Sequence, residues 1–256
     1  MRALLIDAGN TRLKWGVVDA GEIEGMGYLP QASIRDSGLG VLTKQLPRDV
    51  DVAMASNVAG ATFATRLMGL IGAHCDLELR FAKTESEGFG LTNAYTAPRS
   101  MGVDRWVAMV GAWAEFGRAC LVVDAGTAVT IDAIDDGGRH LGGQILPGVE
   151  LMAKALANET SDIPMTGLSE PGQFLGLKLF TGDTAHAVAS GSESAVTGAV
   201  ERAFRILRSS AYDAELVLTG GDASRMLTAL GTEPLHRPHL VLQGLARMLQ
   251  DTLNER

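Results

Sequence analysis

The sequence contains few residues of the kinds that form cross-links or bind metals. Its 256 residues include 2 cysteines and 5 histidines, and the cysteines, Cys75 and Cys120, each stand beside apolar residues. This argues against a disulfide framework and favours the reducing cytoplasm as the location. The pair His236 and His239 is interrupted by a proline, which resists a single helical face, so we expect no metal site there.

Long apolar runs and an excess of positive charge are also missing. No apolar stretch approaches the roughly 20 residues that span a bilayer. The stretch ALLID at 3–7, with only Arg2 before it, is too short for the apolar part of a signal peptide and is followed by charge. The formal net charge is −8, whereas nucleic acids and acidic membranes bind basic surfaces. We therefore expect neither as a partner. A content of 46% hydrophobic residues is sufficient for a globular core.

The sequence does contain the same short pattern twice. LLIDAGNTRLKWGVVD at 4–19 and LVVDAGTAVTIDAIDD at 121–136 each run from an apolar strand into Asp-Ala-Gly and a threonine, followed by a second strand. Asp7 and Asp124 lie nearly half a chain apart, so each pattern opens about half of the sequence. This spacing predicts a duplicated half-domain.

Alternation and turn residues predict the same order of elements in both halves, 1–115 and 116–256. Each half has three antiparallel strands followed by helices that alternate with strands, which is an α/β arrangement. Between the halves, 95–117 reads as a loop running into a helix. Strands are expected at 3–7, 12–19, 22–29, 50–56, 76–82, 119–126, 128–135, 139–146 and 215–221. Helices are expected at 38–46, 60–73, 149–156, 184–208, shortly after 221 and at 240–256, with a loop through residue 172.

The two Asp-Ala-Gly turns have the residue types that bind nucleotide phosphates. A glycine after a strand lets backbone N–H groups approach phosphate oxygens, and the threonine adds a hydroxyl donor. An aspartate at the strand end is a hard oxygen ligand suited to Mg²⁺, and Lys14 could reach a phosphate as a point charge. The GxxxxGK[ST] pattern is absent, so this would not be a P-loop. Alternatively, the turns only form hairpins, although two copies with a hydroxyl favour the phosphate interpretation.

These turns resemble the two phosphate motifs of the actin, hexokinase and heat-shock ATPase superfamily, and LTGGDA at 218–223 fits its adenosine-side glycine motif. That resemblance implies two ribonuclease-H-like halves of the βββαβα type, with ATP in the cleft between them. More narrowly, the sequence resembles the type III pantothenate kinases, or Bvg accessory factor family. Met101 stands where a leucine is expected, and 158–180 carries no matching motif. The motifs, in order, are DAGNTRLK (7–14), GVDRW (102–106), DAGTAVT (124–130) and GGQILPG (142–148).

The resemblance implies ligands for ATP and for cations. Asp7 would also help to hold Mg²⁺, and Asp124 would bind a monovalent cation, K⁺ or NH₄⁺. As alternatives, Lys14 could be a solvated strand residue and Asp124 a turn-former. GGQILPG is expected, by analogy alone, to turn the chain near the phosphates. The implied phosphate contacts are Asp7, Ala8, Gly9, Asn10, Thr11, Arg12, Leu13, Lys14 and Thr127.

The resemblance also implies a pantothenate site around a predicted helix start. Asp104 in the first turn would be the catalytic base, accepting the proton of the substrate hydroxyl, although an acidic residue there could simply stabilise the helix. Arg105 could bind a carboxylate or a phosphate or form a surface salt bridge, and Thr184 could be a helix N-cap. The implied contacts are Tyr95, Gly102, Val103, Asp104, Arg105 and Thr184.

We therefore expect a cytoplasmic kinase that phosphorylates the primary hydroxyl of pantothenate, the first step toward coenzyme A. Another small-molecule kinase and a non-enzymatic ATP-dependent regulatory protein remain alternatives. The resemblance implies a homodimer. The helix expected from GVDRW has two apolar stripes, more than one core face usually needs, which favours it or its neighbours as the contact. The stripes are Val103, Val107, Val110 and Ala114, and Trp106, Met109 and Trp113.

Overall fold

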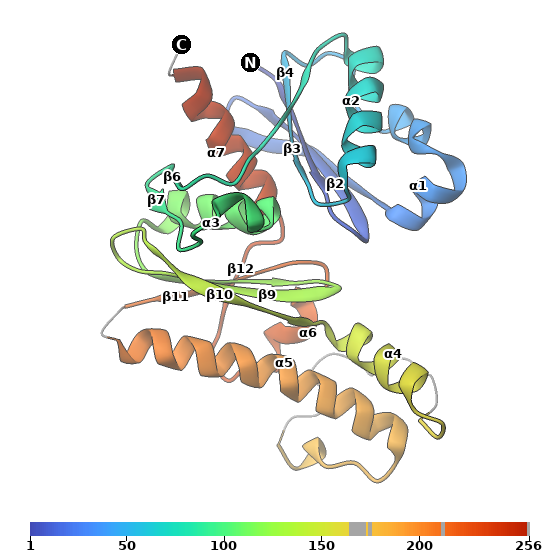
Figure 1. Ribbon diagram of the computed structural model, residues 1–256, viewed down its shortest axis with the longest axis vertical. Coiled ribbons are helices and arrows are strands. Elements are labelled where there is room, and N and C mark those ends of the chain that lie inside the picture. Colours follow the sequence, from blue (N-terminus) through green and yellow to red (C-terminus); the bar gives the residue numbers. More distant parts are fainter. Residues whose placement is uncertain (164–172, 174–175, 211–212, 255–256) are drawn as a thin grey trace. The chain divides into compact units, whose positions relative to one another are not determined.

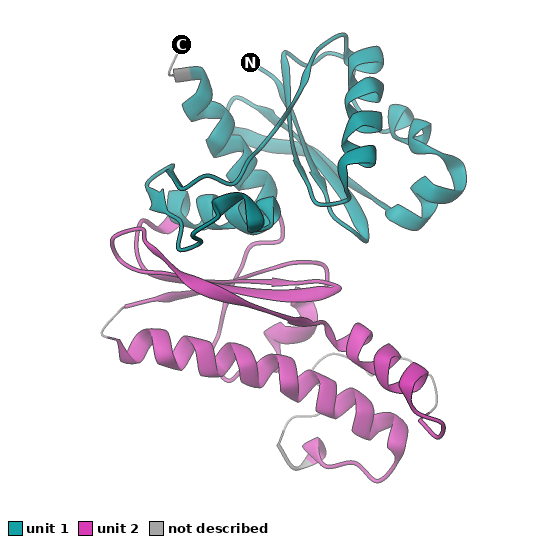
Figure 2. Cartoon of the chain, viewed as in Figure 1, with its two compact units in different colours: residues 1–115, 240–256 teal, residues 116–239 magenta. Residues whose placement is uncertain are grey.

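The computed structural model describes residues 1–163, 173, 176–210 and 213–254. They form two compact units (Figure 2), one made of Met1–Glu115 together with the segment from Leu240, the other of Phe116–His239. Part of the predicted loop before residue 172 lies outside the described residues. Among the helices that are described, none has the length and apolar character needed to cross a bilayer.

The first unit contains a five-stranded mixed sheet in the order β3-β2-β1-β4-β5. Figure 1 labels β2, β3 and β4 of this sheet. β1 pairs antiparallel with β2, and β2 with β3, whereas β1, β4 and β5 run parallel. The carboxyl ends of the parallel strands therefore meet at one edge, from which the 8–12 turn emerges. The strands are β1 (Ala3–Ala8), β2 (Arg12–Asp19), β3 (Glu22–Pro30), β4 (Val52–Asn57) and β5 (Leu79–Phe81).

The second unit repeats this sheet in the order β10-β9-β8-β11-β12, with the same pattern of antiparallel and parallel pairs. The predicted duplication, with three antiparallel strands opening each copy, is thus confirmed. The strands are β8 (Cys120–Ala125), β9 (Ala128–Ile134), β10 (His140–Pro147), β11 (Glu215–Thr219) and β12 (Leu235–His236).

The helices of the first unit differ from the prediction in one place. Where a helix was expected at 38–46, an α-helix, Gln31–Ser37, ends before Gly38, whose φ of +81° suits glycine, and a 3-10 helix, Leu39–Lys44, follows it. A two-stranded hairpin, β6 (Glu87–Gly88) and β7 (Leu91–Thr92), precedes helix α3 in the sequence. The helical elements are α1 (Gln31–Ser37), η1 (Leu39–Lys44), α2 (Ala61–Cys75), η2 (Pro98–Ser100), α3 (Val103–Phe116) and α7 (Leu240–Asn254).

Helices cover both faces of the first sheet. Leu4 and Ile6 point toward α2, in a core shared with Leu67 and Ile71. Residues that alternate with them point to the other face, where α7 contacts β1, β2 and β4. We expected 240–256 in the second half, but the amphipathic helix α7 completes the first unit, because it covers the remaining apolar face of the sheet.

Helix α3 also packs against α7. A Cβ at Gly244 would lie 2.0 Å from the Val107 carbonyl oxygen, and one at Gly111 2.6 Å from the Leu240 oxygen, so glycines permit the close approach. The middle of α3 is almost completely buried within the chain. Its two apolar stripes are therefore not surface patches, and the argument that used them to place a dimer contact on this helix was wrong.

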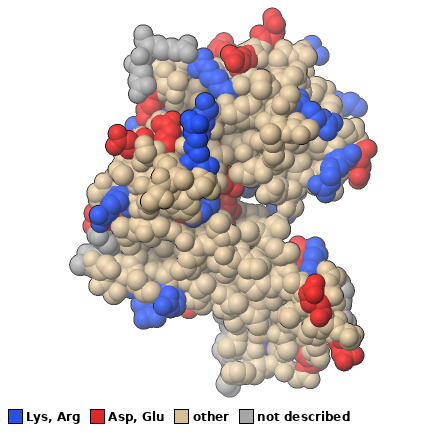
Figure 3. All heavy atoms as spheres, in the orientation of Figure 1, with Lys and Arg blue, Asp and Glu red and all other residues tan. Residues whose placement is uncertain are grey.

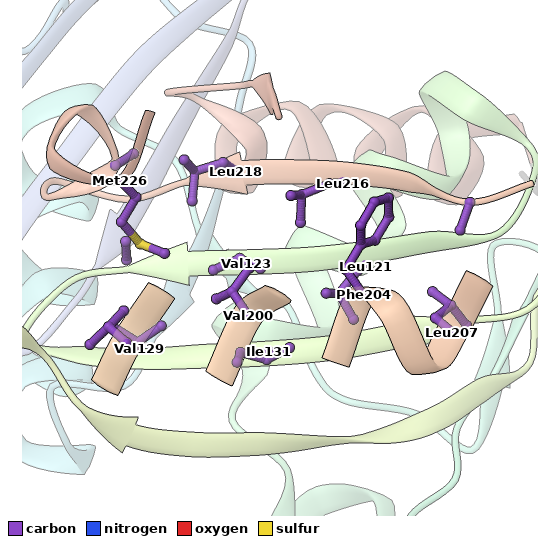
Figure 4. Packing of buried hydrophobic residues seen from close by; sticks show 14 of the residues in the cluster. Leu121, Val123, Val129, Ile131, Val200, Phe204, Leu207, Leu216, Leu218 and Met226 are labelled. Carbon is purple, nitrogen blue, oxygen red and sulfur yellow. The ribbon is translucent and has the colours of Figure 1, made fainter. Parts of the chain in front are cut away.

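The second unit has one long helix against its sheet. α5 (Thr184–Ser209) packs Val200, Phe204 and Leu207 on Leu121, Val123 and Ile131 and on neighbouring residues of β11 (Figure 4). This apolar layer fixes the strand ends that carry the second turn. The other helices are α4 (Val149–Glu159), η3 (Gly176–Leu179) and α6 (Ala223–Leu227).

Candidate active site

The first turn begins at a row of three neighbouring residues on adjacent strands. Asp7 of β1 pairs with Lys14 of β2 and with Ser56 of β4. Directly paired residues share a face of a sheet, and alternation with Leu4 and Ile6 assigns this row to the α7 face. Ser56 is fully buried, and its hydroxyl has no hydrogen-bond partner among the described residues. This serine was missed because a lone serine at a strand end carries no sequence signal.

Backbone hydrogen bonds close the first turn. The Gly9 N–H donates to the Arg12 carbonyl at 3.1 Å. Gln31, the first residue of α1 and only 5% exposed, donates its backbone N–H to the Thr11 oxygen at 2.7 Å. Its side-chain Nε2 donates to the Gly9 oxygen at 2.9 Å. Sequence reasoning missed this glutamine as well.

The predicted phosphate residues of this turn fall into two groups. Asn10, Thr11 and Arg12 are exposed, and the Arg12 guanidinium lies 5.7 Å from the centre of the Tyr28 ring. Lys14 is half-buried. The side chains of Ala8 and Leu13, by contrast, are buried in the apolar core, so only the backbone of these two residues could contact a ligand.

The second turn also runs from an aspartate at a strand end through Ala-Gly to a threonine, but it is one residue shorter than the first. Asp124, half-buried, pairs with Thr130 and Thr219 on the neighbouring strands. The Gly126 N–H donates to the Ala128 oxygen at 3.1 Å, and the N–H of Gly148 donates to the oxygen of Thr127 at 2.8 Å. The end of the GGQILPG segment therefore lies against this turn, and its position near bound phosphates stays a prediction.

The LTGGDA segment closes on the same turn. Gly220 has φ of +104°, and a Cβ there would lie 2.2 Å from the Ala125 oxygen and 2.5 Å from Oδ1 of Asp124. The Asp222 N–H donates to the Ala125 oxygen at 2.9 Å. Only glycine allows this approach, which brings the LTGGDA segment against the second turn.

Asp104 is the second residue of α3 and is half-buried. Its Oδ1 accepts a hydrogen bond from the Arg105 backbone N–H at 2.8 Å. A Cβ at Gly102 would lie 2.6 Å from the same oxygen, so the carboxylate bends back over the residue before the helix. The glycine leaves room for the carboxylate in this position, and the hydrogen bond from the Arg105 N–H fixes its orientation.

Two of the predicted substrate residues contact each other in the first unit. The Arg105 guanidinium donates to the Tyr95 hydroxyl at 3.0 Å and lies 5.7 Å from the ring centre. Arg105 is 5% exposed, so the alternative that it forms a surface salt bridge was wrong. Asn93 helps to place Tyr95, because its Oδ1 accepts from the Tyr95 N–H at 2.9 Å.

A cavity of about 790 Å³ opens beside the start of α3. It is lined by residues 83–87 and 97–99 and by none of the predicted substrate residues. Thr84, in the cavity lining, donates its hydroxyl to the carbonyl of Met101 at 3.1 Å, and Met101 directly precedes Gly102.

Thr184 is the first residue of α5 in the second unit and is exposed. The N-cap is instead Asp183, whose Oδ1 accepts from the His186 N–H at 3.0 Å. This hydrogen bond holds the pKa of the Asp183 carboxyl below its ordinary value. The alternative role for Thr184, as the helix cap, was therefore wrong, and its hydroxyl is not committed to that task.

Charged side chains are otherwise dispersed. On the face shown in Figure 3, lysines and arginines occur singly or in small groups among acidic residues. No group of three or more His, Cys, Asp or Glu residues suited to a metal occurs in the described part of the chain. Each turn thus offers one carboxylate, a donor set that suits a cation held mainly by water and phosphate oxygens.

Comparison with known proteins gives a consistent result. The sequence model of the family "Type III pantothenate kinase" matches residues 3–206. A type III pantothenate kinase of Nitrosococcus oceani is 34% identical, over 97% of this chain and 94% of that protein. One of Azoarcus sp. is 39% identical, over 95% and 89%.

Solved structures share the fold at lower identity. A Campylobacter jejuni protein described as a Baf family transcriptional activator has a TM-score of 0.62 at 20% identity, covering 98% of this chain and 99% of that one. The activator of 2-hydroxyisocaproyl-CoA dehydratase from Clostridium difficile, solved with bound ADPNP, has a TM-score of 0.53 at 13% identity, covering 100% and 96%.

Proposed function

Because the chain belongs to the type III pantothenate kinase family, it transfers the γ-phosphoryl group of ATP to the primary hydroxyl of pantothenate, and we propose which residues perform each part of this reaction. The observation that carries the function is the family match over residues 3–206, with relatives aligned over nearly the whole chain. The product, 4′-phosphopantothenate, enters coenzyme A biosynthesis.

The two Asp-Ala-Gly turns bind the phosphates of ATP. In the first turn the backbone N–H groups of the exposed Asn10 and Thr11, together with the Thr11 hydroxyl, donate to phosphate oxygens, and the half-buried Lys14 adds a positive charge. Thr127 of the second turn makes a further phosphate contact. Glycines at both turns support this role, because they allow backbone N–H groups to approach a ligand.

Cations complete the charge balance. Asp7 would help to hold Mg²⁺, and its half-buried carboxylate at a strand end fits a metal that keeps most of its water. When bound with ATP, Mg²⁺ supplies positive charge to the phosphate oxygens, which promotes phosphoryl transfer. Asp124 would bind a monovalent cation, K⁺ or NH₄⁺.

Asp104 is the catalytic base. As the pantothenate hydroxyl oxygen forms its bond to the γ-phosphorus, the O–H bond breaks and the proton passes to the Asp104 carboxylate. The bond from the γ-phosphorus to the bridging oxygen breaks, and ADP leaves with that electron pair. The hydrogen bond from the Arg105 N–H keeps the carboxylate oriented during this transfer.

Arg105 and Tyr95 bind the anionic end of pantothenate, together with the backbone of Gly102 and Val103. The contact of the guanidinium with the Tyr95 hydroxyl and ring holds it in one orientation, which suits a fork of donors to a carboxylate. Thr184 contributes another substrate contact through its exposed hydroxyl.

An assay of acceptor specificity tests this function. The purified protein is supplied with ATP, Mg²⁺ and K⁺ and a panel of alcohols that includes pantothenate, pantetheine and a hexose, with the products identified by mass spectrometry. Phosphorylated pantothenate is expected, and the Asp104→Asn variant is the matched control for contaminating kinases. A protein that phosphorylates the hexose faster than pantothenate would instead be a different small-molecule kinase.

The protein is further proposed to be a cytoplasmic homodimer. Support for the dimer comes from the family resemblance and from exposed apolar side chains on the second unit, with Phe180 81% exposed. Light scattering at micromolar concentration should give twice the monomer mass, and Phe180→Glu should reduce it. A wild-type mass of one chain would contradict the dimer. These exposed apolar residues of the second unit include Leu151 and Leu156 of α4, Leu179 at the end of η3, and Phe180.

A further inference from the structure

We propose that Gln31 is a positioning residue that holds the first phosphate turn in its ATP-binding shape. This inference rests on the proposed function of that turn. Gln31 makes two hydrogen bonds to it, one from its backbone N–H to the Thr11 oxygen and one from its side chain to the Gly9 oxygen. It does so from a site that is only 5% exposed, so water does not readily replace these donors.

The side-chain bond sets the direction of one peptide group. The described chain has no cis peptide bonds, and in a planar trans peptide the N–H points opposite to the preceding carbonyl. Because the Gly9 carbonyl is directed at Gln31, the Asn10 N–H is directed away from it, on an exposed part of the turn. Gln31 therefore presents the Asn10 N–H as a phosphate donor without touching the ligand.

The second turn provides an internal comparison. β3 and β10 both end in a proline, and the next residue, Gln31 or Gly148, donates its N–H to the threonine of its turn, at 2.7 and 2.8 Å. Gly148 has no side chain, and a Cβ there would lie 2.3 Å from the Gly126 oxygen. Gly126 corresponds to Gly9 of the first turn. In the second turn the Gly126 carbonyl leaves no room for a side chain at 148, whereas in the first turn the Gly9 carbonyl accepts a hydrogen bond from the Gln31 side chain.

The presence of a side-chain hydrogen bond in the first turn alone can be explained by the length of that turn. The first turn has an extra residue, Asn10, between its glycine and threonine. A longer turn has more conformations to lose, and the Gln31 side chain restricts them where the shorter turn needs only the backbone bond. The side-chain amide is thus specific to the longer turn.

Two substitutions remove the side-chain donor while keeping the backbone bond. Gln31→Met has similar length without polar atoms, and Gln31→Glu has the same shape but, when ionised, can only accept. The exposed Gln45 of the same unit provides the control, Gln45→Met. Binding of a non-hydrolysable ATP analogue is measured by calorimetry without pantothenate, so the result does not depend on the acceptor. Steady-state kinetics and thermal melting follow.

We expect both Gln31 variants to bind the analogue about tenfold more weakly at pH 8, the effect of losing one buried hydrogen bond. The KM for ATP should rise with little change in kcat or in the KM for pantothenate. Gln31→Glu should recover affinity relative to wild type as the pH falls toward 5, because a protonated carboxyl can donate to the Gly9 oxygen.

Several results would overturn the proposal. These are wild-type affinity in Gln31→Met, equal effects of Gln31→Met and Gln45→Met, or a Gln31→Glu variant whose affinity ratio to wild type does not change with pH. A variant pair that is unfolded at 25 °C would also overturn it, because Gln31 would then serve stability. If the wild type binds the analogue but does not phosphorylate pantothenate, the proposed function fails while the role of Gln31 is still decided.

Discussion

Substitution of Gly148 by alanine isolates one steric contact beside the second phosphate turn. Gly148 has φ of −69° and ψ of 166°, which alanine adopts readily, so backbone strain does not contribute. The added Cβ would lie 2.3 Å from the Gly126 oxygen and 2.9 Å from the Thr127 oxygen. Both are backbone atoms, and no side-chain rotation can relieve the contact.

The size of the effect follows from these distances. An ordinary contact of a Cβ with an oxygen needs roughly 3.4 Å, so the turn or α4 must move by about 1 Å. Overpacking of this kind costs about 1–3 kcal/mol, or a fall in Tm of roughly 2–12 °C for a chain of this size. A displacement of about 1 Å at reacting groups can reduce the rate by about 10²-fold, and we expect kcat/KM for ATP to fall by about that factor.

Gly198→Ala is the matched control. Gly198 lies within α5, where an added Cβ would meet no other heavy atom within 4 Å, so this change should raise stability by about 0.5–1 kcal/mol and leave kcat/KM unchanged. Differential scanning calorimetry and the coupled kinase assay measure both variants. A Gly148→Ala protein with wild-type Tm and wild-type kcat/KM would refute the claim that this contact shapes the second turn.

Four further predictions concern other parts of the molecule. Asp104→Asn should lower kcat by about 10²–10⁴-fold with near-normal ATP affinity, and normal turnover would remove the catalytic assignment. Activity should require K⁺ or NH₄⁺ because of Asp124, whereas equal rates in Na⁺ and K⁺ would contradict that role. Gly244→Ala places a Cβ 2.0 Å from the Val107 oxygen and should lower the Tm by more than Gly148→Ala does; an unchanged melting curve would count against the close packing of α3 and α7. Because the pKa of Asp183 lies below its ordinary 3.8 in the folded protein, its ionised form stabilises α5 above that pH, and the Tm difference from Asp183→Ala should shrink as the pH falls below about 4.

Much of the fold could be predicted because the Asp-Ala-Gly pattern occurs twice, each time after a strand and before one with clear alternation of its side chains. The error at 38–46 has a local cause. The apolar residues there are spaced as in an α-helix, but Gly38 adopts a positive φ that separates α1 from the 3-10 helix, and the apolar spacing does not reveal this. The N-cap of α5 could have been assigned correctly, because Asp is at least as good a cap as Thr, and Asp183 precedes Thr184.

Other features depend on contacts between distant segments. The two apolar stripes of α3 indicated an exposed contact surface, but a helix that is apolar all round is equally typical of a buried one, and the sequence alone does not distinguish them. Gln31 gave no signal by residue type. The role of Gln31 becomes recognisable only when the two copies are compared, because Pro30 and Pro147 correspond and the residue after each donates a hydrogen bond to the threonine of the phosphate turn in its own unit.

The assignment of α7 to the first unit has a consequence for how the protein is synthesised. The second unit is continuous in sequence, from Phe116 to His239, whereas the first is interrupted by it. A ribosome that produces the chain from its N-terminus completes the second unit before the segment that covers the α7 face of β1 and β4 has emerged. Domains generally fold as units during synthesis. The first sheet, although made first, must therefore wait with one apolar face uncovered and reach its final packing last.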